Sequence, residues 1–301
     1  MDIVSTPESA FDDVPDYDYE PRYVAADAPG DPELAYVDTD PEGDSDETFL
    51  CLHGEPTWGY LYRKMVPALA ERGRVVVPDF LGFGRSDKYT GRDAYTFDLH
   101  YDSLAGFVET LDLTGVTLVC QDWGSILGLP YAVSDAPERF DRIVAMNALL
   151  TDGETALPDT WYAFRDMVVD AGELDVSRVV DGGCVTDLSA EVRAGYDAPF
   201  PDEASKAGAY AWPPMVPQDA SMPGADRHAQ LREDLGEWEK PFFALFADSD
   251  PITERFRDLF RDLVPTADDE PNVWVEGAAH FIQEDAGERC AEHIVDFVNR
   301  H

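Results

Sequence analysis

The chain has 301 residues, of which 44% are hydrophobic and 12% aromatic, and this excludes an intrinsically disordered protein because enough apolar surface is available to form a core. Its 22 lysines and arginines stand against 62 aspartates and glutamates, and the resulting net charge of −40 excludes nucleic acid as a partner. The acids are spread along the whole chain, which predicts adaptation to a salt-filled cytoplasm, where molar salt shortens the Debye length to about 3 Å and screens self-repulsion.

Targeting segments, metals and cofactors are not expected. No apolar run approaches the roughly 18 residues of a membrane span, and the acidic N-terminus lacks the basic and apolar pattern of a signal peptide. We therefore expect a cytoplasmic protein that does not insert into a membrane. The cysteines are widely spaced, so neither a metal site nor a structural disulfide is predicted. They are Cys51, Cys120, Cys184 and Cys290.

The N-terminal residues 1–33 are rich in Asp, Pro and Tyr, which predicts an irregular segment along the surface. Helical spacing of apolar residues predicts helices at about 60–71 and 101–111. Because strands alternate with helices, we expect an α/β fold, that is, a mainly parallel sheet with helices on both faces. Short apolar runs predict these strands at 34–37, 48–52, 75–77, 116–121, 143–146, 242–246 and 273–275.

The alternation of strands and helices stops between about Thr151 and Arg227. This stretch is rich in proline and contains several short helical pieces without a good strand. Ligands of open α/β sheets bind outside the carboxyl ends of the strands, so an insertion there would enclose the site. We therefore expect a core domain of residues 1–150 and 228–301 and a helical cap of residues 151–227.

Residues 116–127 read Val-Thr-Leu-Val-Cys-Gln-Asp-Trp-Gly-Ser-Ile-Leu, an apolar strand that breaks at Asp122 and continues as a helix. This pattern predicts a nucleophile elbow, the turn that exposes one side chain above a sheet. The motif G-x-S-x-G carries a serine there, whereas this chain has a carboxylate, and Cys120 replaces the first glycine. A carboxylate displaces a leaving group from an alkyl carbon and forms an ester, so Asp122 is the candidate nucleophile. The alternative is an ordinary N-cap of the following helix.

A base and an acid are expected after later strands. His280 lies in Gly-Ala-Ala-His-Phe after the last predicted strand, where enzymes with this elbow carry the base. The acid, which holds the imidazole in the correct tautomer, is expected in Ala-Asp-Ser-Asp-Pro after the preceding strand. We choose Asp250, before the proline, over Asp248.

Two backbone amides are expected to form an oxyanion hole. One comes from the loop after the strand that ends at Leu52, and the other comes from the residue after the nucleophile. This assigns the amides of Glu55 and Trp123. The Glu55 side chain is interpreted as solvated or ion-paired, with only its amide involved in the chemistry.

Five motifs follow one another: His-Gly-Glu-Pro-Thr-Trp (53–58), Pro-Asp-Phe-Leu-Gly-Phe-Gly-Arg-Ser-Asp-Lys (78–88), Gln-Asp-Trp-Gly (121–124), Tyr-Asp-Ala-Pro-Phe-Pro (196–201) and Gly-Ala-Ala-His-Phe (277–281). Together they resemble the haloalkane dehalogenases, in the subfamily whose catalytic acid follows the strand after the cap. The resemblance runs from about residue 5 to the C-terminus and is strongest over 48–150. It implies an α/β-hydrolase fold and hydrolysis of carbon–halogen bonds to alcohol and halide. In this reaction an alkyl ester on Asp122 is hydrolysed by water that His280 activates.

The resemblance also implies two donors for the departing halide. The Trp123 indole N–H matches the family's first halide-binding tryptophan, and the second donor comes from an early cap helix. Alignment places Phe164 at the second position, although phenylalanine has no N–H to donate. Trp161, which also fits a packing role under the cap, and Tyr162 are the alternatives. The partners expected are a small apolar halogenated substrate, water and halide.

Two other functions stay open. Epoxide hydrolases use the same Asp nucleophile and His-activated water, and the cap tyrosines Tyr162, Tyr196 and Tyr210 would protonate the epoxide oxygen. Gln121 before the nucleophile is typical of dehalogenases, whereas epoxide hydrolases usually carry His there. The other alternative is a hydrolase-fold protein that binds a small ligand without turnover.

Overall fold

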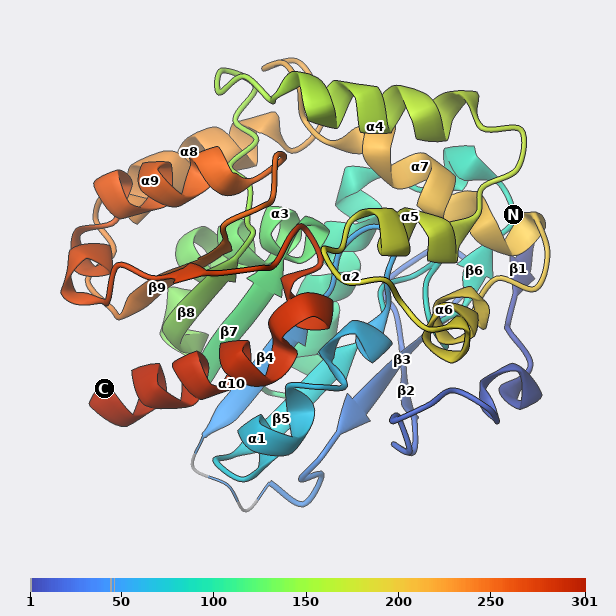
Figure 1. The fold of residues 1–301 in the computed structure, drawn as a ribbon, viewed down its shortest axis with the longest axis horizontal. Coiled ribbons are helices and arrows are strands. Elements are labelled where there is room, and N and C mark those ends of the chain that lie inside the picture. Colours follow the sequence, from blue (N-terminus) through green and yellow to red (C-terminus); the bar gives the residue numbers. More distant parts are fainter. Residues whose placement is uncertain (1, 44, 46) are drawn as a thin grey trace.

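Eight strands form one sheet in the order β10-β9-β8-β7-β4-β5-β3-β2 in the computed structural model, which describes residues 2–43, 45 and 47–301 (Figure 1). Strand β3 pairs antiparallel with β2 and β5, and the other pairings within this sheet are parallel. A separate antiparallel pair joins β1 to β6. The predicted α/β fold with a mainly parallel sheet is therefore confirmed.

The helices and strands have the following bounds. The strands are β1 (Ile3–Val4), β2 (Arg22–Ala25), β3 (Glu33–Asp38), β4 (Thr48–Leu52), β5 (Arg74–Pro78), β6 (Lys88–Tyr89), β7 (Val116–Gln121), β8 (Phe140–Met146), β9 (Phe242–Ala247) and β10 (Trp274–Val275). The α-helices are α1 (Val66–Ala70), α2 (Phe97–Thr110), α3 (Trp123–Pro130), α4 (Asp159–Asp170), α5 (Val176–Gly182), α6 (Ala190–Asp197), α7 (Ala207–Met215), α8 (Ala225–Leu235), α9 (Glu254–Leu263) and α10 (Ile282–Arg300). Among the described residues, no helix has the length and apolar character needed to cross a bilayer.

The central strands β4 and β7 are buried along their whole length. Their sequences are nearly continuous apolar runs because helices cover both faces of a parallel sheet. Figure 1 shows α1 and α10 in front of the sheet and α2 behind it, while α3 packs against β4 and β7. The register pairs Leu52 with Cys120 and Gln121 with Met146, so the carboxyl ends of β4, β7 and β8 meet at one edge. The segments that follow these three strands therefore begin side by side.

The stretch between Thr151 and Arg227, all of it described, contains helices and no strand. Helices α4 to α7 fall within it, and α8 begins at Ala225, just before the expected boundary with the core domain. In Figure 1, α4 lies above the strands, and α5, α6 and α7 lie below it toward the right. These helices thus lie over the edge at which the strands end.

A buried ionic cluster ties the helical insertion to the core. The Tyr196 hydroxyl on α6 donates a hydrogen bond to Glu284 on α10, and Arg63 forms an ion pair with the same carboxylate. Glu284 is almost completely buried, and Lys64 Nζ lies 3.0 Å from its second oxygen. Because removing one partner would leave a buried charge uncompensated, this contact holds α6 in place against the core.

Two expectations about the N-terminal third are wrong in part. Within residues 1–33, expected to be irregular, Arg22–Ala25 forms the edge strand β2, which lacks an apolar alternation because most of its side chains are exposed. The helix expected at 60–71 is instead a 3₁₀ turn, Gly59–Tyr62, followed by α1. Pro67 lies in the first turn of α1, where its missing N–H is tolerated, and it would disrupt a helix running through from residue 60.

Candidate active site

Asp122 lies at the sharp turn between β7 and α3. Its φ of +50° is in the left-handed region, which costs about 1–3 kcal/mol for a residue other than glycine and persists only where the surroundings impose it. One such constraint is Gly124, where an added Cβ would lie 2.2 Å from the carbonyl oxygen of Leu52. The helix can therefore start against β4 only with glycine at this position. The predicted elbow thus forms, and it lifts the Asp122 carboxylate above the edge of the sheet.

Backbone amides hold the Asp122 carboxylate. The Glu55 N–H donates to Asp122 Oδ1 over 2.7 Å, and the Trp123 N–H also donates to this carboxylate. The loop approaches so closely that a Cβ at Gly54 would lie 2.3 Å from Oδ1. Burial raises the pKa of Asp122, and the nearby His280 and the two amides only partly offset this. The two amides assigned to an oxyanion hole therefore both point at the nucleophile.

Hydrogen bonds of His53 and Thr57 fix the loop that carries Glu55. The Phe80 N–H donates to His53 Nε2 over 3.0 Å, and the Thr57 hydroxyl donates to the Gly54 carbonyl over 2.9 Å. Burial lowers the pKa of His53 to about 3, so the ring stays neutral and can accept the hydrogen bond from Phe80. His53 therefore has a structural role, which is to set the position of the Glu55 amide.

His280 lies between two carboxylates. Its Nδ1 is 3.0 Å from Asp250 Oδ2, and its Nε2 is 3.7 Å from Asp122 Oδ2. Asp250 is itself buried and accepts hydrogen bonds from the Thr253 hydroxyl and from the Ile252 N–H. The structure thus brings the three predicted side chains together in the order nucleophile, base and acid.

Asp248, the alternative acid, is engaged elsewhere. It accepts a hydrogen bond from the Gly277 N–H over 2.9 Å and another from the Ser249 hydroxyl over 3.0 Å. The side chain of Asp248 is exposed, whereas Asp250 is buried against the imidazole. The geometry therefore favours Asp250.

The protonation of these groups is coupled. Burial lowers the pKa of His280, but the carboxylates of Asp250 and Asp122 outweigh this and raise it from 6.5 to about 8. Burial raises the pKa of Asp250, but the charge of His280 and three hydrogen bonds outweigh this and hold it below its usual value. A pKa of about 8 favours the protonated imidazole at neutral pH, where His280 lies between Asp250 and Asp122.

The sequence singled out Gln121 only as the residue before the nucleophile and did not place Gln121 or Asn147 next to His280. Gln121 Nε2 donates to the His280 carbonyl oxygen over 3.3 Å and lies 3.2 Å from His280 Nε2. Asn147 Nδ2 donates to the same carbonyl oxygen over 2.9 Å. Gln121 ends β7 and Asn147 follows β8, so the signal that could have found them is their place at the carboxyl ends of adjacent strands.

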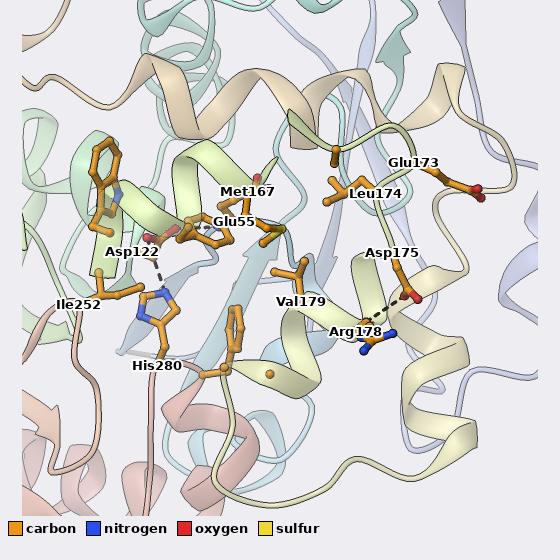
Figure 2. Close-up of a pocket in the computed structure, with 16 residues that line it drawn as sticks. Glu55, Asp122, Met167, Glu173, Leu174, Asp175, Arg178, Val179, Ile252 and His280 are labelled. Atoms are coloured by element: carbon orange, nitrogen blue, oxygen red, sulfur yellow. Dashed lines mark hydrogen bonds and ion pairs between the residues drawn. The ribbon is translucent and has the colours of Figure 1, made fainter. Parts of the chain in front are cut away.

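A cavity of about 560 Å³ opens beside the nucleophile. Figure 2 shows Asp122 and His280 at one end, Met167 and Val179 further along, and Arg178 at the far end. Many of the side chains that line the cavity are apolar, among them Phe164, Met167, Leu174, Val179, Ile252 and Phe281. Among the described residues, no cluster of His, Cys, Asp or Glu is arranged to hold a metal ion.

The Glu55 side chain differs from the sequence interpretation, which had it solvated or ion-paired. It is 4% exposed and lines the cavity, and within the described part of the chain neither carboxyl oxygen has a hydrogen-bond partner. Burial and the adjacent Asp122 raise the pKa of Glu55 well above its usual value. This raised pKa favours the neutral form of Glu55, which places less negative charge next to the nucleophile than an ionised carboxylate would.

The three aromatic side chains considered for halide binding lie in different places. Trp161 is 4% exposed and lines the cavity together with Phe164, which is half-buried. Trp123 is also buried, but it is not among the described residues that line the cavity, and its ring stacks on Trp212 at a centroid distance of 4.8 Å. Of the aromatic side chains that face the cavity, Trp161 is the one with an N–H to donate.

The three cap tyrosines do not converge on Asp122. The Tyr196 hydroxyl donates to Glu284, and the Tyr210 hydroxyl donates to Glu203 over 2.9 Å. Tyr162 packs edge-on against Trp161, and no described tyrosine lines the cavity. The described part of the chain thus places no tyrosine hydroxyl at the cavity wall to protonate an epoxide.

Known proteins resemble this chain over its whole length. A model of the alpha/beta hydrolase fold family matches residues 47–286. Haloalkane dehalogenase of Psychrobacter cryohalolentis is 39% identical over 99% of both chains, and haloalkane dehalogenase 1 of Mycobacterium tuberculosis is 41% identical over 99% of both chains. The tetrameric structure of haloalkane dehalogenase DpaA from Paraglaciecola agarilytica superimposes with a TM-score of 0.90, at 35% identity over 97% of both chains.

Proposed function

The chain belongs to the haloalkane dehalogenases, hydrolases of the alpha/beta hydrolase fold that act on carbon–halide bonds, and from this premise we propose that Asp122 works as a covalent nucleophile. The observation that carries the proposal is the position of its carboxylate, with Oδ1 bound by the Glu55 amide and Oδ2 3.7 Å from His280 Nε2. One oxygen thus faces donors, while the other faces the base.

In the first step, an oxygen of Asp122 attacks the carbon that carries the halogen. A carbon–oxygen bond forms, the carbon–halogen bond breaks, and the halide leaves with the bonding electrons. Burial assists this step because it strips water from the carboxylate and the apolar lining excludes competing water. The product is an alkyl ester of Asp122.

In the second step, water attacks the carbonyl carbon of this ester while His280 takes its proton. The amides of Glu55 and Trp123 then stabilise the oxyanion, and the alcohol leaves with the proton from His280. Asp250 holds Nδ1 and stabilises the imidazolium. Because the ester removes the charge of Asp122, one of the two carboxylates that raise the pKa of His280 disappears just when the base must be neutral.

This coupling predicts the pH dependence of ester hydrolysis. Hydrolysis needs neutral His280, so kcat is expected to fall as the pH decreases through the imidazole pKa. The resting pKa is about 8, and the acid limb of kcat should lie below this value because the ester is uncharged. NMR titration of His280 is expected to give a lower pKa in Asp122→Asn than in the wild type. A kcat that increases toward acid pH would contradict the assignment.

We assign one halide donor to the indole N–H of Trp161, which lines the cavity, and the other to Trp123, which does not line it but directly follows the nucleophile and matches the family's first halide-binding tryptophan. Trp161→Phe keeps the ring but removes the N–H, and it is expected to lower kcat/KM for a bromoalkane by roughly 10-fold or more, since a hydrogen bond to a charged group contributes about 1.5–3 kcal/mol. Phe164→Leu, which removes no donor from the same cavity wall, is the control and should stay within a few-fold of the wild type. Equal effects of the two variants would refute the donor role of Trp161.

Epoxide hydrolysis stays the alternative with the same nucleophile. The hydroxyls of Tyr196 and Tyr210, which already donate to Glu284 and Glu203, argue against it, and Tyr162 is not among the described residues that line the cavity. Incubation with 1-bromobutane and, separately, with styrene oxide distinguishes the two reactions. We expect bromide from the first and no diol from the second, and the reverse would establish the alternative.

The domain division and the salt adaptation also belong to this proposal. Residues 151–227 form the cap over a core of 1–150 and 228–301, and α4 and α5 of this cap line the cavity.

The net charge of −40 means that many negatively charged side chains repel one another in dilute buffer. Molar potassium chloride is therefore expected to raise Tm by roughly 5 °C or more, since each kcal/mol shifts Tm by about 2–4 °C in a domain of this size. An unchanged or lower Tm would contradict salt adaptation.

A further inference from the structure

Asn147, the residue that follows β8, is fully buried and has a left-handed φ of +38°. Asparagine tolerates this conformation better than most residues other than glycine. Its place is set by the register of β8 against β7, which pairs Met146 with Gln121 and so puts Asn147 beside Asp122. It lies at the same edge of the sheet as the nucleophile without being part of the triad.

The backbone oxygen, Oδ1 and Nδ2 of Asn147 each bind a different catalytic segment. Its backbone oxygen accepts a hydrogen bond from the Asp122 N–H over 3.3 Å. Its Oδ1 accepts one from the Ala247 N–H over 2.9 Å, at the end of the strand that leads to Asp250. Its Nδ2 donates to the carbonyl oxygens of Ala279 and His280, over 2.9 Å in both cases. One side chain thus joins the segments of nucleophile, acid and base.

We propose that Asn147 is a positioning residue, which fixes His280 between Asp250 and Asp122 through the carbonyl groups of the base loop. The inference rests on the proposed function. In a reaction with an ester intermediate, His280 is needed for ester hydrolysis but not for ester formation. Ester formation depends on Asp122. The Asp122 N–H donates to the backbone oxygen of Asn147, and this hydrogen bond remains when the side chain of Asn147 is changed. Ester hydrolysis depends on the imidazole, whose loop is bonded by the side chain.

The chemistry of the amide explains why asparagine is needed here. The site requires a donor for two carbonyl oxygens and an acceptor for one N–H, and asparagine supplies both. An aspartate would keep the acceptor for Ala247 but would direct a carboxylate oxygen at two carbonyl oxygens. Gln121 also donates to the His280 carbonyl, over 3.3 Å, but it does not replace the bonds to Ala279 and Ala247.

The test separates the two steps by rapid mixing with 1-bromobutane. Asn147→Gly accepts the left-handed φ and lacks all side-chain bonds, whereas Asn147→Asp keeps the acceptor alone. In both variants we expect a bromide burst of one equivalent per active site, with ester formation within a few-fold of the wild type. Ester hydrolysis should be roughly 10-fold to 100-fold slower, because small misplacements of a catalytic group cost about this much. The His280 pKa in Asn147→Gly should also fall below about 8, since Asp250 is held less closely.

Val144→Ala is the matched control, because Val144 is buried on the same strand and pairs with Val119 of β7, three residues before the nucleophile. It should lower Tm without a change in the ratio of the two rates. The inference is overturned if Asn147→Gly or Asn147→Asp hydrolyses the ester within about 2-fold of the wild type. It is equally overturned if these variants merely lose burst amplitude while the remaining sites react normally. A wild type that releases no bromide would refute the proposed function, and this inference with it.

Discussion

His280→Gln is expected to release one equivalent of halide and then to stop. Glutamine fills a similar volume and is polar, but it cannot take a proton from water. Asp122 still attacks the substrate, because the Glu55 amide continues to hold Oδ1 of its carboxylate after the imidazole is removed. Without the base, steady turnover should fall by roughly 10²–10⁴-fold, the contribution typical of general base catalysis. The ester therefore accumulates.

The measurement combines halide release with intact-protein mass spectrometry. A burst equal to the enzyme concentration should coincide with a mass increase by one alkyl group, and peptide mapping should place that group on Asp122. His293→Gln, in which a half-buried histidine of α10 is replaced, is the control and should turn over like the wild type. Full steady turnover by His280→Gln would remove His280 from the mechanism.

Asp122→Ala is expected to abolish both the halide burst and the mass increase. Loss of the nucleophile leaves no route to the ester, and single removals of this kind lower kcat by about 10⁴–10⁶-fold. The fold should survive, because the carboxylate is buried at a raised pKa and its removal relieves an electrostatic cost. We therefore expect a Tm equal to that of the wild type or higher.

The control for Asp122→Ala is Asp112→Ala. Asp112 has a similar left-handed φ of +46°, but its side chain is 84% exposed and pairs with Arg139 away from the cavity. This variant should keep full activity, which would show that strain at a left-handed alanine does not by itself inactivate the enzyme. Halide release by Asp122→Ala at even a tenth of the wild-type rate would rule out Asp122 as the nucleophile.

The α/β fold and the elbow were predictable because their signals are local. An apolar run that breaks at Asp122 and continues as a helix specifies strand, turn and helix within twelve residues. The choice between Asp250 and Asp248 had no comparable local signal, because both follow β9 and what separates them is tertiary: Asp250 is buried against His280 Nδ1, whereas Asp248 is exposed. The strand β2 had no local signal. A half-buried strand is marked by alternating apolar and polar residues, and this alternation is missing from β2 because most of its side chains are exposed.

Contacts between distant segments could not be predicted in this way. Asn147 reaches His280 across 133 positions of the chain, and no pattern around either residue indicates the bond. The environment of Glu55 was also missed, because whether a carboxylate is solvated depends on what surrounds it, and this one lines a cavity whose other walls include α4 and α5 of the cap. Likewise, helical spacing alone did not decide whether Trp161 or Phe164 faces the substrate, and both line the cavity.

The most direct test of the covalent mechanism is a single turnover in H₂¹⁸O, with enzyme in excess over 1-bromobutane. If water attacks the carbonyl carbon of an Asp122 ester, the alcohol keeps an oxygen from the carboxylate and the new oxygen enters the protein. The alcohol of the first turnover should therefore be unlabelled, and ¹⁸O should appear in the peptide that contains Asp122. An ¹⁸O-labelled alcohol with an unlabelled Asp122 would show that water attacks the substrate directly, and it would contradict the covalent mechanism.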